Sequence, residues 1–366
     1  MVETLKYASI SIQEVLASKL RLEANVFNVD ARKAYEILNN CKWEIVNLWS
    51  TNGLIKSAFY PGRFRRIYVE KGNGYPMLLP SQMLEIKPQA SKYISEKTFN
   101  KIGNLKVDKD TLLITRSGSI GNCTIVSDWL DGLTMSDDII RVKFKNEFDM
   151  GFVYAYLQTE IGRCILSTNN YGSVIQHIEP EHLENVRIPN PSAEIKEKIH
   201  NLIMQSFELR DQSNNLIEKA EHILIDELHL PPFEHLKTEL YDNQVKLKTF
   251  CVKLDTLNNR FDGSYHDPIV ESILDYFFDY AETISSLGEL CEDITMPGIF
   301  KRIYVGEGQG IPFLGTTDIK ELSPRIEKYL SYKAHKKLIE KDLSLKENMI
   351  LQANRGSVSV GDVVLV

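Results

Sequence analysis

An internal repeat restricts the folds open to this chain more than any other feature of its sequence. Residues 64–95 and 300–331 align without gaps, and 14 of the 32 aligned positions are identical. The identical pairs include Arg66/Arg302, Tyr68/Tyr304, Gly74/Gly310, Pro76/Pro312, Lys92/Lys328 and Tyr93/Tyr329. Identity at this level between two parts of one chain predicts a duplicated domain, with the same elements in both copies.

The repeat extends in both directions, but the second copy is shorter than the first. Downstream, the run Thr115-Arg-Ser-Gly-Ser-Ile-Gly is similar to Ala353-Asn-Arg-Gly-Ser-Val-Ser-Val-Gly. Upstream, Arg21–Phe27 has a weaker counterpart in Arg260–His266. Residues 126–229 have no counterpart before Val366. We therefore expect an incomplete second copy, either in a fragment or in a naturally shortened subunit.

Local patterns within the first copy predict an α+β fold. Leu112–Ile114 and Ile139–Val142 are short apolar runs bounded by Gly, Asn, Ser and Asp, which is typical of strands. The stretch Met150–Leu166 places Phe152 and Tyr156 at helical spacing. We expect duplicated mixed α/β domains, the second incomplete, separated by a long helix of the coiled-coil type.

That long helix is predicted over residues 192–229. Pro191 and Ser192 mark its start, and Pro231-Pro232 ends it. Small or apolar residues recur at alternating spacings of four and three, which is the seam of a coiled coil. They are Ile195, Ile199, Leu202, Ser206, Leu209, Ser213, Leu216, Ala220 and Ile223. Two structures fit this pattern: a spacer that pairs with another helix, which we favour, and an amphipathic helix packed on its own domain.

Charge is unevenly distributed along the chain. The formal net charge is −7, yet residues 51–126 contain twelve Lys and Arg against five Asp and Glu, a local balance of 12 − 5 = +7. A basic segment in an acidic chain indicates either a nucleic-acid footprint or an ordinary solvated surface.

The sequence offers no sign of a membrane, metal or cofactor. Its apolar runs are shorter than the roughly 18–20 residues that span a bilayer, and the N-terminus lacks the apolar block of a signal peptide. The cysteines are scattered, without a CxxC pair or zinc-ligand spacing: Cys41, Cys123, Cys164, Cys251 and Cys291. We expect a cytoplasmic protein with no membrane association, no metal and no cofactor.

The order of these parts resembles a known family, the specificity subunits of type I restriction–modification enzymes. Val186-Arg-Ile-Pro-Asn-Pro, followed by Glu194-Ile-Lys-Glu-Lys-Ile, resembles the start of that family's central spacer helix. Thr115-Arg-Ser-Gly-Ser-Ile-Gly and Phe313-Leu-Gly-Thr-Thr-Asp-Ile resemble short runs in its target-recognition domains. The resemblance covers nearly the whole chain and departs from the family in the missing end of the second domain.

The resemblance implies DNA recognition without catalysis. Each domain would read one half of a bipartite site in double-stranded DNA, and the helices would fix the gap. A DNA methyltransferase subunit and an ATP-dependent nuclease (restriction) subunit would do the chemistry. The expected boundaries are 1–191 for target-recognition domain 1, 192–230 for the spacer helix, 231–286 for a linker and the start of the second repeat, and 287–366 for a partial target-recognition domain 2.

The residues that suit DNA contact are cations, which hold phosphates, and planar or donor-rich groups, which reach base edges. Pro61-Gly-Arg-Phe-Arg-Arg supplies three guanidinium groups in four positions. In an extended segment Arg63 and Arg65 share one face and Arg66 takes the other, where a salt bridge is its alternative role. The full set of candidates is Arg63, Arg65, Arg66, Ser81, Gln82, Arg116, Ser117, Ser119, Tyr171, Lys301 and Arg302.

Two further expectations concern specificity and partners. Ser81 and Gln82 differ from Thr317 and Asp318 in the otherwise matched second copy, as readers of two different half-sites would, although drift gives the same difference. The partner interface is expected on the seam of the long helix, where it would hold the methyltransferase subunit or pair two copies of the chain as an antiparallel homodimer. Its residues are Ile195, Ile199, Leu202, Leu209, Leu216 and Ile223.

An enzyme and a protein-binding scaffold are the alternative classes. Leu230-Pro-Pro-Phe has the prolines of a DNA amino-methyltransferase turn but Leu in place of the polar residue. Glu85-Ile-Lys87 and Glu194-Ile-Lys196 match the end of a nuclease signature without its upstream Pro-Asp partner. Asp137-Asp138 could hold a metal or serve as turn acids. A coiled-coil scaffold would explain the helix but not the duplicated, locally basic domain.

Overall fold

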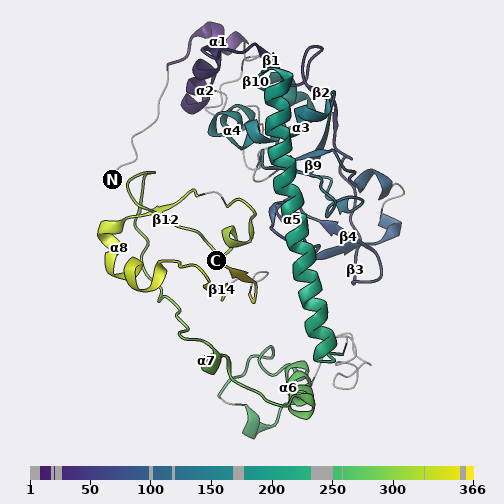
Figure 1. Ribbon diagram of the computed structural model, residues 1–366, viewed down its shortest axis with the longest axis vertical. Coiled ribbons are helices and arrows are strands. Elements are labelled where there is room, and N and C mark those ends of the chain that lie inside the picture. The colour runs from purple at the N-terminus through teal and green to yellow at the C-terminus, as the bar shows by residue number, and fades with distance from the viewer. Residues whose placement is uncertain are drawn as a thin grey trace. The chain divides into compact units, whose positions relative to one another are not determined.

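The computed structural model confirms an α+β fold (Figure 1). It describes residues 9–17, 20, 27–98, 102–117, 120–167, 177–231, 250–257, 259–324, 326–354 and 360–366. The chain forms two compact units: one of Met1–Asn214, Arg302–His335 and Leu345–Val366, the other of Asn215–Lys301 and Lys336–Ser344.

The first repeat is built around a four-stranded antiparallel sheet with the strand order β2-β9-β6-β7. Its strands are β2 (Ile55–Phe59), β6 (Leu112–Thr115), β7 (Cys123–Ile125) and β9 (Ile139–Phe144), so both strands predicted from the sequence are confirmed. Leu112 and Ile114 lie in one buried cluster while Leu113 lies in another. Since successive side chains of a strand point to opposite faces, this central sheet is buried on both sides.

Helices cover one face of this sheet. The stretch predicted to be helical is confirmed, and it forms two helices, α3 (Glu147–Gln158) and α4 (Glu160–Ser167). Thr159 is extended between them, and its hydroxyl donates to the Tyr156 carbonyl at 2.6 Å and accepts from the Gly162 amide at 3.1 Å. A threonine that satisfies both helix ends makes the break, because its side chain replaces the missing backbone partners.

A second sheet of the first repeat has the order β3-β5-β4-β8. Its strands are β3 (Tyr68–Val69), β4 (Tyr75–Leu78), β5 (Lys92–Ile94) and β8 (Thr134–Met135). β4 and β8 are parallel, whereas the other pairs are antiparallel. Elsewhere in the repeat, α1 (Ile12–Ala17) and α2 (Val29–Asn39) precede β1 (Ile45–Asn47), which pairs antiparallel with β10 (Arg187–Pro189).

The predicted duplication is confirmed strand by strand. β11 (Tyr304–Val305), β12 (Ile311–Pro312) and β13 (Tyr329–Leu330) form a sheet in the order β11-β13-β12. Tyr68 pairs with Ile94 in the first repeat, and its equivalent Tyr304 pairs with Leu330 in the second. Tyr75 likewise pairs with Ile94, and Ile311 with Leu330. The aligned sequences therefore adopt the same register.

One glycine in each repeat explains part of this identity. A Cβ atom on Gly74 would lie inside van der Waals contact of the Ile94 carbonyl oxygen and the Val69 side chain. A Cβ atom on Gly310 would meet the Leu330 carbonyl oxygen and Val305 in the same way. Only glycine lets the turn approach the neighbouring strand this closely.

The duplication also reaches beyond the aligned core. β14 (Ile350–Gln352) and β15 (Val363–Leu365) form an antiparallel hairpin with the register of β6 and β7. Upstream, Asn28 caps α2 by accepting from the Asp30 amide. Asp267 caps α6 (Pro268–Tyr280) by accepting from the Ile269 amide. The weak upstream echo in the sequence therefore continues into a helix with the same kind of cap.

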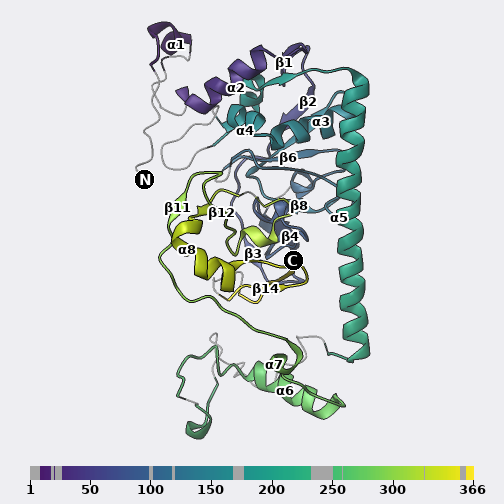
Figure 2. The same cartoon turned by 60° about the vertical axis from the view of Figure 1, so that its left-hand side comes forward.

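The long predicted helix is confirmed as α5 (Ala193–Glu227) (Figure 1). Its first part runs beside α3 and the central sheet in both views (Figure 2). Phe207 is buried in the main core, and Ile199, Ile203 and Met204 pack against that core. The helix is thus packed on its own domain along one face, as the second of the two structures considered above requires.

The remaining short elements complete the described chain. They are η2 (Gln82–Leu84), η3 (Glu96–Thr98), η4 (Ile102–Leu105), η5 (Pro180–Asn185), η6 (Leu254–Thr256), α7 (Leu287–Leu290), η7 (Asp318–Lys320), α8 (Tyr332–Leu338) and η8 (Ile339–Leu343). In the part of the chain that the structure describes, no helix has the length and hydropathy that a membrane crossing needs.

Candidate nucleic-acid interface

The arginine-rich segment 61–67 is an irregular loop rather than a strand. Gly62 has a φ of +80°, in the region that favours glycine, so it turns the chain directly before Arg63. Arg63 and Arg65 are exposed, whereas Arg66 is half-buried. The alternation expected for an extended segment is therefore present.

Arg66 anchors this loop to the domain. Its Nε donates to Asp137 Oδ1 at 3.1 Å, its Nη2 pairs with the same oxygen, and Nη2 lies 3.6 Å from Asp138 Oδ2. Burial alone would lower the pKa of Arg66, but the hydrogen-bonded carboxylate of Asp137 outweighs it and raises that pKa. The salt bridge considered as its alternative role is what the structure shows, while its contact with DNA stays a prediction.

Arg116 is a second, more deeply buried anchor. Its side chain is 5% exposed, and its guanidinium makes two contacts with Glu179, one of them Nε to Oε2 at 3.2 Å. Nη1 also lies 3.4 Å from Asp138 Oδ1, and the Tyr60 ring packs 4.4 Å from the guanidinium carbon. Asp138 therefore joins the two arginine anchors through its two carboxylate oxygens.

Ser117 extends this network to a segment far along the chain. Its hydroxyl lies 2.6 Å from His177 Nδ1 and donates to Asp138 Oδ1 at 3.2 Å. The Ile178 amide donates to the Arg116 carbonyl at 3.0 Å, which holds the two segments together. His177, Glu179 and Tyr60 were not among the residues expected from the sequence.

Arg141 shapes the turn that carries both acids. It is 2% exposed, and its two terminal nitrogens donate to the carbonyls of Leu105, Met135, Ser136 and Ile139. Burial lowers its pKa to about 10, although the nearby Asp137 charge opposes that change. A buried guanidinium that binds four carbonyls fixes the backbone from which Asp137 and Asp138 project.

Arg63 and Arg65 stand apart from these anchored groups. Neither forms an ion pair with any residue that the structure describes, although their loop is held at Tyr60 and Arg66 on either side. The result is an anchored loop with two exposed guanidinium groups. Such groups can pair with phosphate oxygens or make bidentate contacts with guanine.

The family comparison covers the part of the chain that begins at the end of this loop. Residues 66–222 match the family described as the type I restriction modification DNA specificity domain. The specificity domain so defined contains Arg66, Arg116 and most of α5, and Arg63 and Arg65 directly precede it.

Several solved structures resemble the chain at low identity. The S subunit of a type I restriction–modification system from M. genitalium is 13% identical, with 89% of this chain and 69% of that chain covered at a TM-score of 0.36. The HsdS subunit from Thermoanaerobacter tengcongensis is 15% identical, with 57% and 49% covered at a TM-score of 0.32. This chain thus spans about half of that second subunit. No curated protein matches the sequence significantly.

Other candidate residues occupy varied places around the specificity domain. Ser81 is exposed, but the Gln82 side chain accepts from the Leu79 amide at 2.9 Å and donates to Ser91 at 2.9 Å. Asp318, the equivalent of Gln82, accepts from the Gly315 amide at 2.7 Å. These two side chains therefore cap equivalent turns, while contact of Ser81 and Gln82 with DNA stays a prediction.

The second repeat supplies Lys301 and Arg302, the equivalents of Arg65 and Arg66. Both are exposed, and Arg302 lies over the Phe313 ring at 5.3 Å. Ser119 and Tyr171 lie outside the described residues. Asp137 and Asp138, considered above as metal ligands, face Arg66 and Arg116, and the described residues contain no group of three or more His, Cys, Asp or Glu suited to a metal.

The seam of α5 divides between two faces. Ile199 packs against the core of its own domain, whereas Leu202, Leu209, Leu216 and Ile223 are exposed. The exposed four recur every seven residues and form a single stripe, called here the α5 stripe. Ile195 is half-buried at the start of the helix.

The opposite face of α5 buries charged and polar side chains beside Phe207, which the sequence pattern did not indicate. Asp211 accepts from the Ser127 hydroxyl at 2.9 Å and from the Trp129 amide at 3.0 Å, and Arg210 donates to Ser127 at 2.9 Å. Nearer the N-terminus, Lys196 pairs with the buried Asp149 at 2.7 Å. Paired groups of this kind fix the rotation of α5, so that the α5 stripe faces away from the domain.

Proposed function

We propose that this chain recognises duplex DNA as the non-catalytic specificity subunit of a type I-like restriction–modification complex in the cytoplasm. It would direct partner methyltransferase and ATP-dependent nuclease subunits to a bipartite site. The observation that carries the proposal is the loop of Arg63 and Arg65, free of ion pairs with described residues and fixed against a DNA specificity domain.

The chemistry of the loop fits this role. Arg66 and Arg116 are paired with carboxylates, so they serve as supports, and Arg63 and Arg65 supply the exposed positive charges of the loop. A guanidinium held on a fixed loop loses less conformational entropy on binding than one on a mobile segment. Arg63 and Arg65 therefore suit a defined register on the DNA backbone or on a guanine edge.

The duplication supports a site in two parts. The same strand register recurs in both repeats, and the second repeat offers Lys301 where the first offers Arg65. Two related but different surfaces on one chain would read two different half-sites. The Ser81/Thr317 and Gln82/Asp318 differences affect turns of the two repeats and would alter shape rather than read bases directly.

Binding to a random-sequence duplex at several salt concentrations tests the DNA contact. The double substitution Arg63→Gln with Arg65→Gln should weaken binding and reduce the salt slope by about two units, one for each lost phosphate contact. Lys33→Gln, an exposed cation on α2, is the matched control and should leave the slope unchanged. An unchanged slope in the double variant would place the DNA surface elsewhere.

The α5 stripe is the proposed dock for the methyltransferase subunit. Four large apolar side chains at heptad spacing, facing away from the domain, form a narrow seam of the kind that pairs with another helix. The same stripe is the surface on which two copies of this chain would pair in the absence of that subunit.

A further inference from the structure

The two repeats touch each other through equivalent residues. Within the first compact unit, the Ile86 amide donates to the Lys320 carbonyl at 2.8 Å, and the Leu322 amide donates to the Leu84 carbonyl at 3.0 Å. Between these bonds Glu85 and Glu321 form an antiparallel bridge. Leu84, Glu85 and Ile86 align with Lys320, Glu321 and Leu322, so each bond is the repeat-equivalent of the other.

This arrangement, called here the repeat junction (84–86 with 320–322), has local two-fold symmetry. A symmetric contact between copies uses the same surface patch on both sides, and duplicated domains can retain such a contact within one chain. The first repeat presents its edge firmly, because the Asn214 side chain of α5 donates to the Ile86 carbonyl at 3.0 Å. Helix α5 therefore holds the junction segment of the first repeat in place.

Charge breaks the symmetry of the repeat junction. Glu85 stands directly opposite Glu321, and like charges in such a pair repel. Lys320 compensates: its Nζ lies 3.6 Å from Glu85 and 3.0 Å from Asp362. In the first repeat the residue equivalent to Lys320 is Leu84. Leu84 packs against a buried cluster and carries no charge.

If the first repeats of two molecules paired through the same segments, the two Glu85 side chains would face each other. No cation would lie beside them, because position 84 is a leucine. A first repeat joined to a second repeat gains the Lys320 ammonium instead. Burial raises the pKa of Glu85, and the Lys320 charge opposes that rise, so the carboxylate depends on this cation to stay ionised. The chemistry thus favours pairing of unlike repeats.

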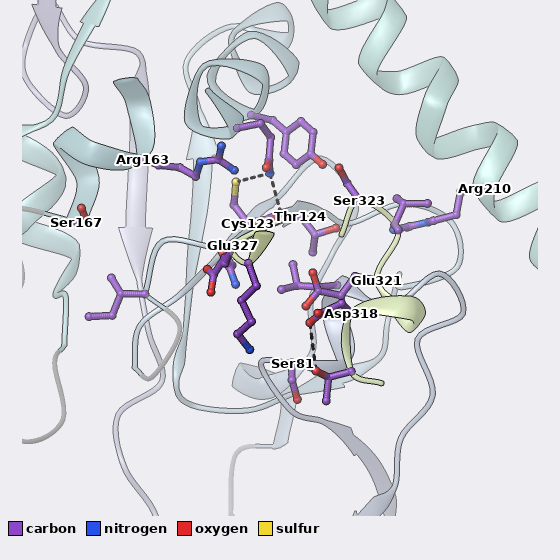
Figure 3. A pocket seen from close by; sticks show the side chains of 18 of the residues that line it. Ser81, Cys123, Thr124, Arg163, Ser167, Arg210, Asp318, Glu321, Ser323 and Glu327 are labelled. Carbon is purple, nitrogen blue, oxygen red and sulfur yellow. Dashed lines mark hydrogen bonds between the residues drawn. The ribbon is translucent and has the colours of Figure 1, made fainter. Parts of the chain in front are cut away.

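We propose that the second repeat of this chain docks on the first through the repeat junction, and that Lys320 selects this pairing over the pairing of two first repeats. A cavity of about 540 Å³ lies beside the repeat junction, lined by Ser81, Cys123 and Arg163 of the first repeat and by Asp318, Glu321 and Ser323 of the second (Figure 3). The contacts across the junction include two backbone hydrogen bonds and the ion pair between Lys320 and Glu85, so a change of one of these charges should alter the docked state.

Disulfide trapping in the full chain tests the docking. Glu85 and Glu321 are the non-hydrogen-bonded pair of an antiparallel bridge, whose Cα atoms lie about 4.5 Å apart, within the range that a disulfide spans. With Cys41, Cys164, Cys251 and Cys291 replaced by Ser and the buried Cys123 replaced by Ala, Glu85→Cys with Glu321→Cys should form an intramolecular cross-link whose yield does not depend on protein concentration. Cross-linking only between molecules, or none, would overturn the docking.

Two controls make the trapping specific. The single variants Glu85→Cys and Glu321→Cys can cross-link only between molecules. Lys71→Cys with Glu307→Cys joins equivalent turn positions outside the repeat junction and should cross-link far less. Equal yields for the two double variants would show random encounter of the repeats and would also overturn the docking.

Amide hydrogen exchange in the full chain, with native Glu85, tests the role of Lys320. The amides of Ile86 and Leu322 donate across the junction, so their protection reports the docked state. Lys320→Glu should lower protection at both amides by about tenfold, since attraction becomes repulsion. Lys333→Glu, an exposed charge reversal in the same repeat, should leave both unchanged. Unaltered protection in Lys320→Glu would remove Lys320 from the proposal.

Discussion

The Asp137 carboxylate holds the Arg66 guanidinium through both Nε and Nη2, and it is almost completely buried while it does so. Arg66 in turn ends the loop that carries Arg63 and Arg65. The acid therefore supports a surface that we propose for binding an anion. Asp137 should therefore increase DNA affinity, although its negative charge alone would decrease it.

Asp137→Asn tests this support directly. Loss of a buried partner should destabilise the domain by about 1–3 kcal/mol, less than for a fully buried pair because the Arg66 side chain is 26% exposed. DNA affinity should fall, although a negative charge has been removed. Glu70→Gln removes an exposed negative charge close to the same loop and should leave affinity equal or slightly higher. Higher affinity in Asp137→Asn would show that only net charge matters.

The close approach at Gly74 gives a stability prediction. Gly74→Ala places a methyl group against the backbone of β5, so the sheet must shift, and we expect a loss of roughly 2–4 kcal/mol in the free energy of unfolding. Gly72→Ala has open space around its Cβ and should cost only the backbone strain of its positive φ, about 1–2 kcal/mol. Denaturant unfolding of the two variants compares them. Equal losses would show that the close approach is relieved at no cost.

How much of this fold the sequence could predict depends on how local the signal is. The repeat, β6, β9 and α5 follow from runs of neighbouring residues, and the shared register follows from the aligned glycines and strands. The carboxylate partners of Arg66 and Arg116 could not be predicted from such runs. Asp137 lies 71 residues from Arg66, and Glu179 lies 63 residues from Arg116, so no local pattern joins them.

Helix α5 shows the same limit within a single element. Its periodicity predicts a seam, and four of the seam residues are exposed as expected. Periodicity counts apolar residues, however, and the face that docks on the domain uses Lys196, Arg210, Asp211 and Asn214. Such residues are usually solvated, and only partners from distant segments, such as Asp149 and Ser127, allow them to be buried.

His200 gives a pH prediction for the packing of α5. Burial lowers its pKa from the ordinary 6.5, against the opposing charges of Glu147 and Asp110, and its Nδ1 accepts from the Gly151 amide at 3.3 Å. The folded state thus binds this proton less readily than the unfolded state. Stability should rise as pH increases through the range below 6.5, and it should fall on acidification.

His200→Gln should flatten this dependence in the range just below pH 6.5, because the titrating group is gone. His222→Gln, an exposed histidine on the same helix, is the matched control and should keep the native profile. Thermal unfolding across this pH range measures both. A native profile in His200→Gln would assign the pH dependence to other groups.

The α5 stripe gives a prediction about the methyltransferase partner. Leu202→Glu, Leu209→Glu and Leu216→Glu together should abolish co-purification of a DNA methyltransferase encoded nearby, because charges would replace the apolar seam. DNA binding through the Arg63 loop should persist. Asn215→Glu with His222→Glu changes exposed polar positions on a different side of the same helix and should leave co-purification intact. Retained methyltransferase in the triple variant would move the dock to the repeats.

The same stripe predicts self-association when the partner is absent. The α5 stripe runs from Leu202 to Ile223, about 32 Å at 1.5 Å per residue, and its leucines and isoleucine are 53–67% exposed. Two such seams can bury each other only by pairing, and an antiparallel pair would place two identical specificity domains at opposite ends of a two-fold dimer.

Light scattering of the full chain should show a dimer at micromolar concentration, and the triple glutamate variant should be monomeric. Added methyltransferase should dissociate the dimer, since the methyltransferase and the second copy of the chain would both bind the α5 stripe. A native chain that stays monomeric with α5 formed would contradict the pairing, and binding of methyltransferase to an intact dimer would show that the two surfaces differ.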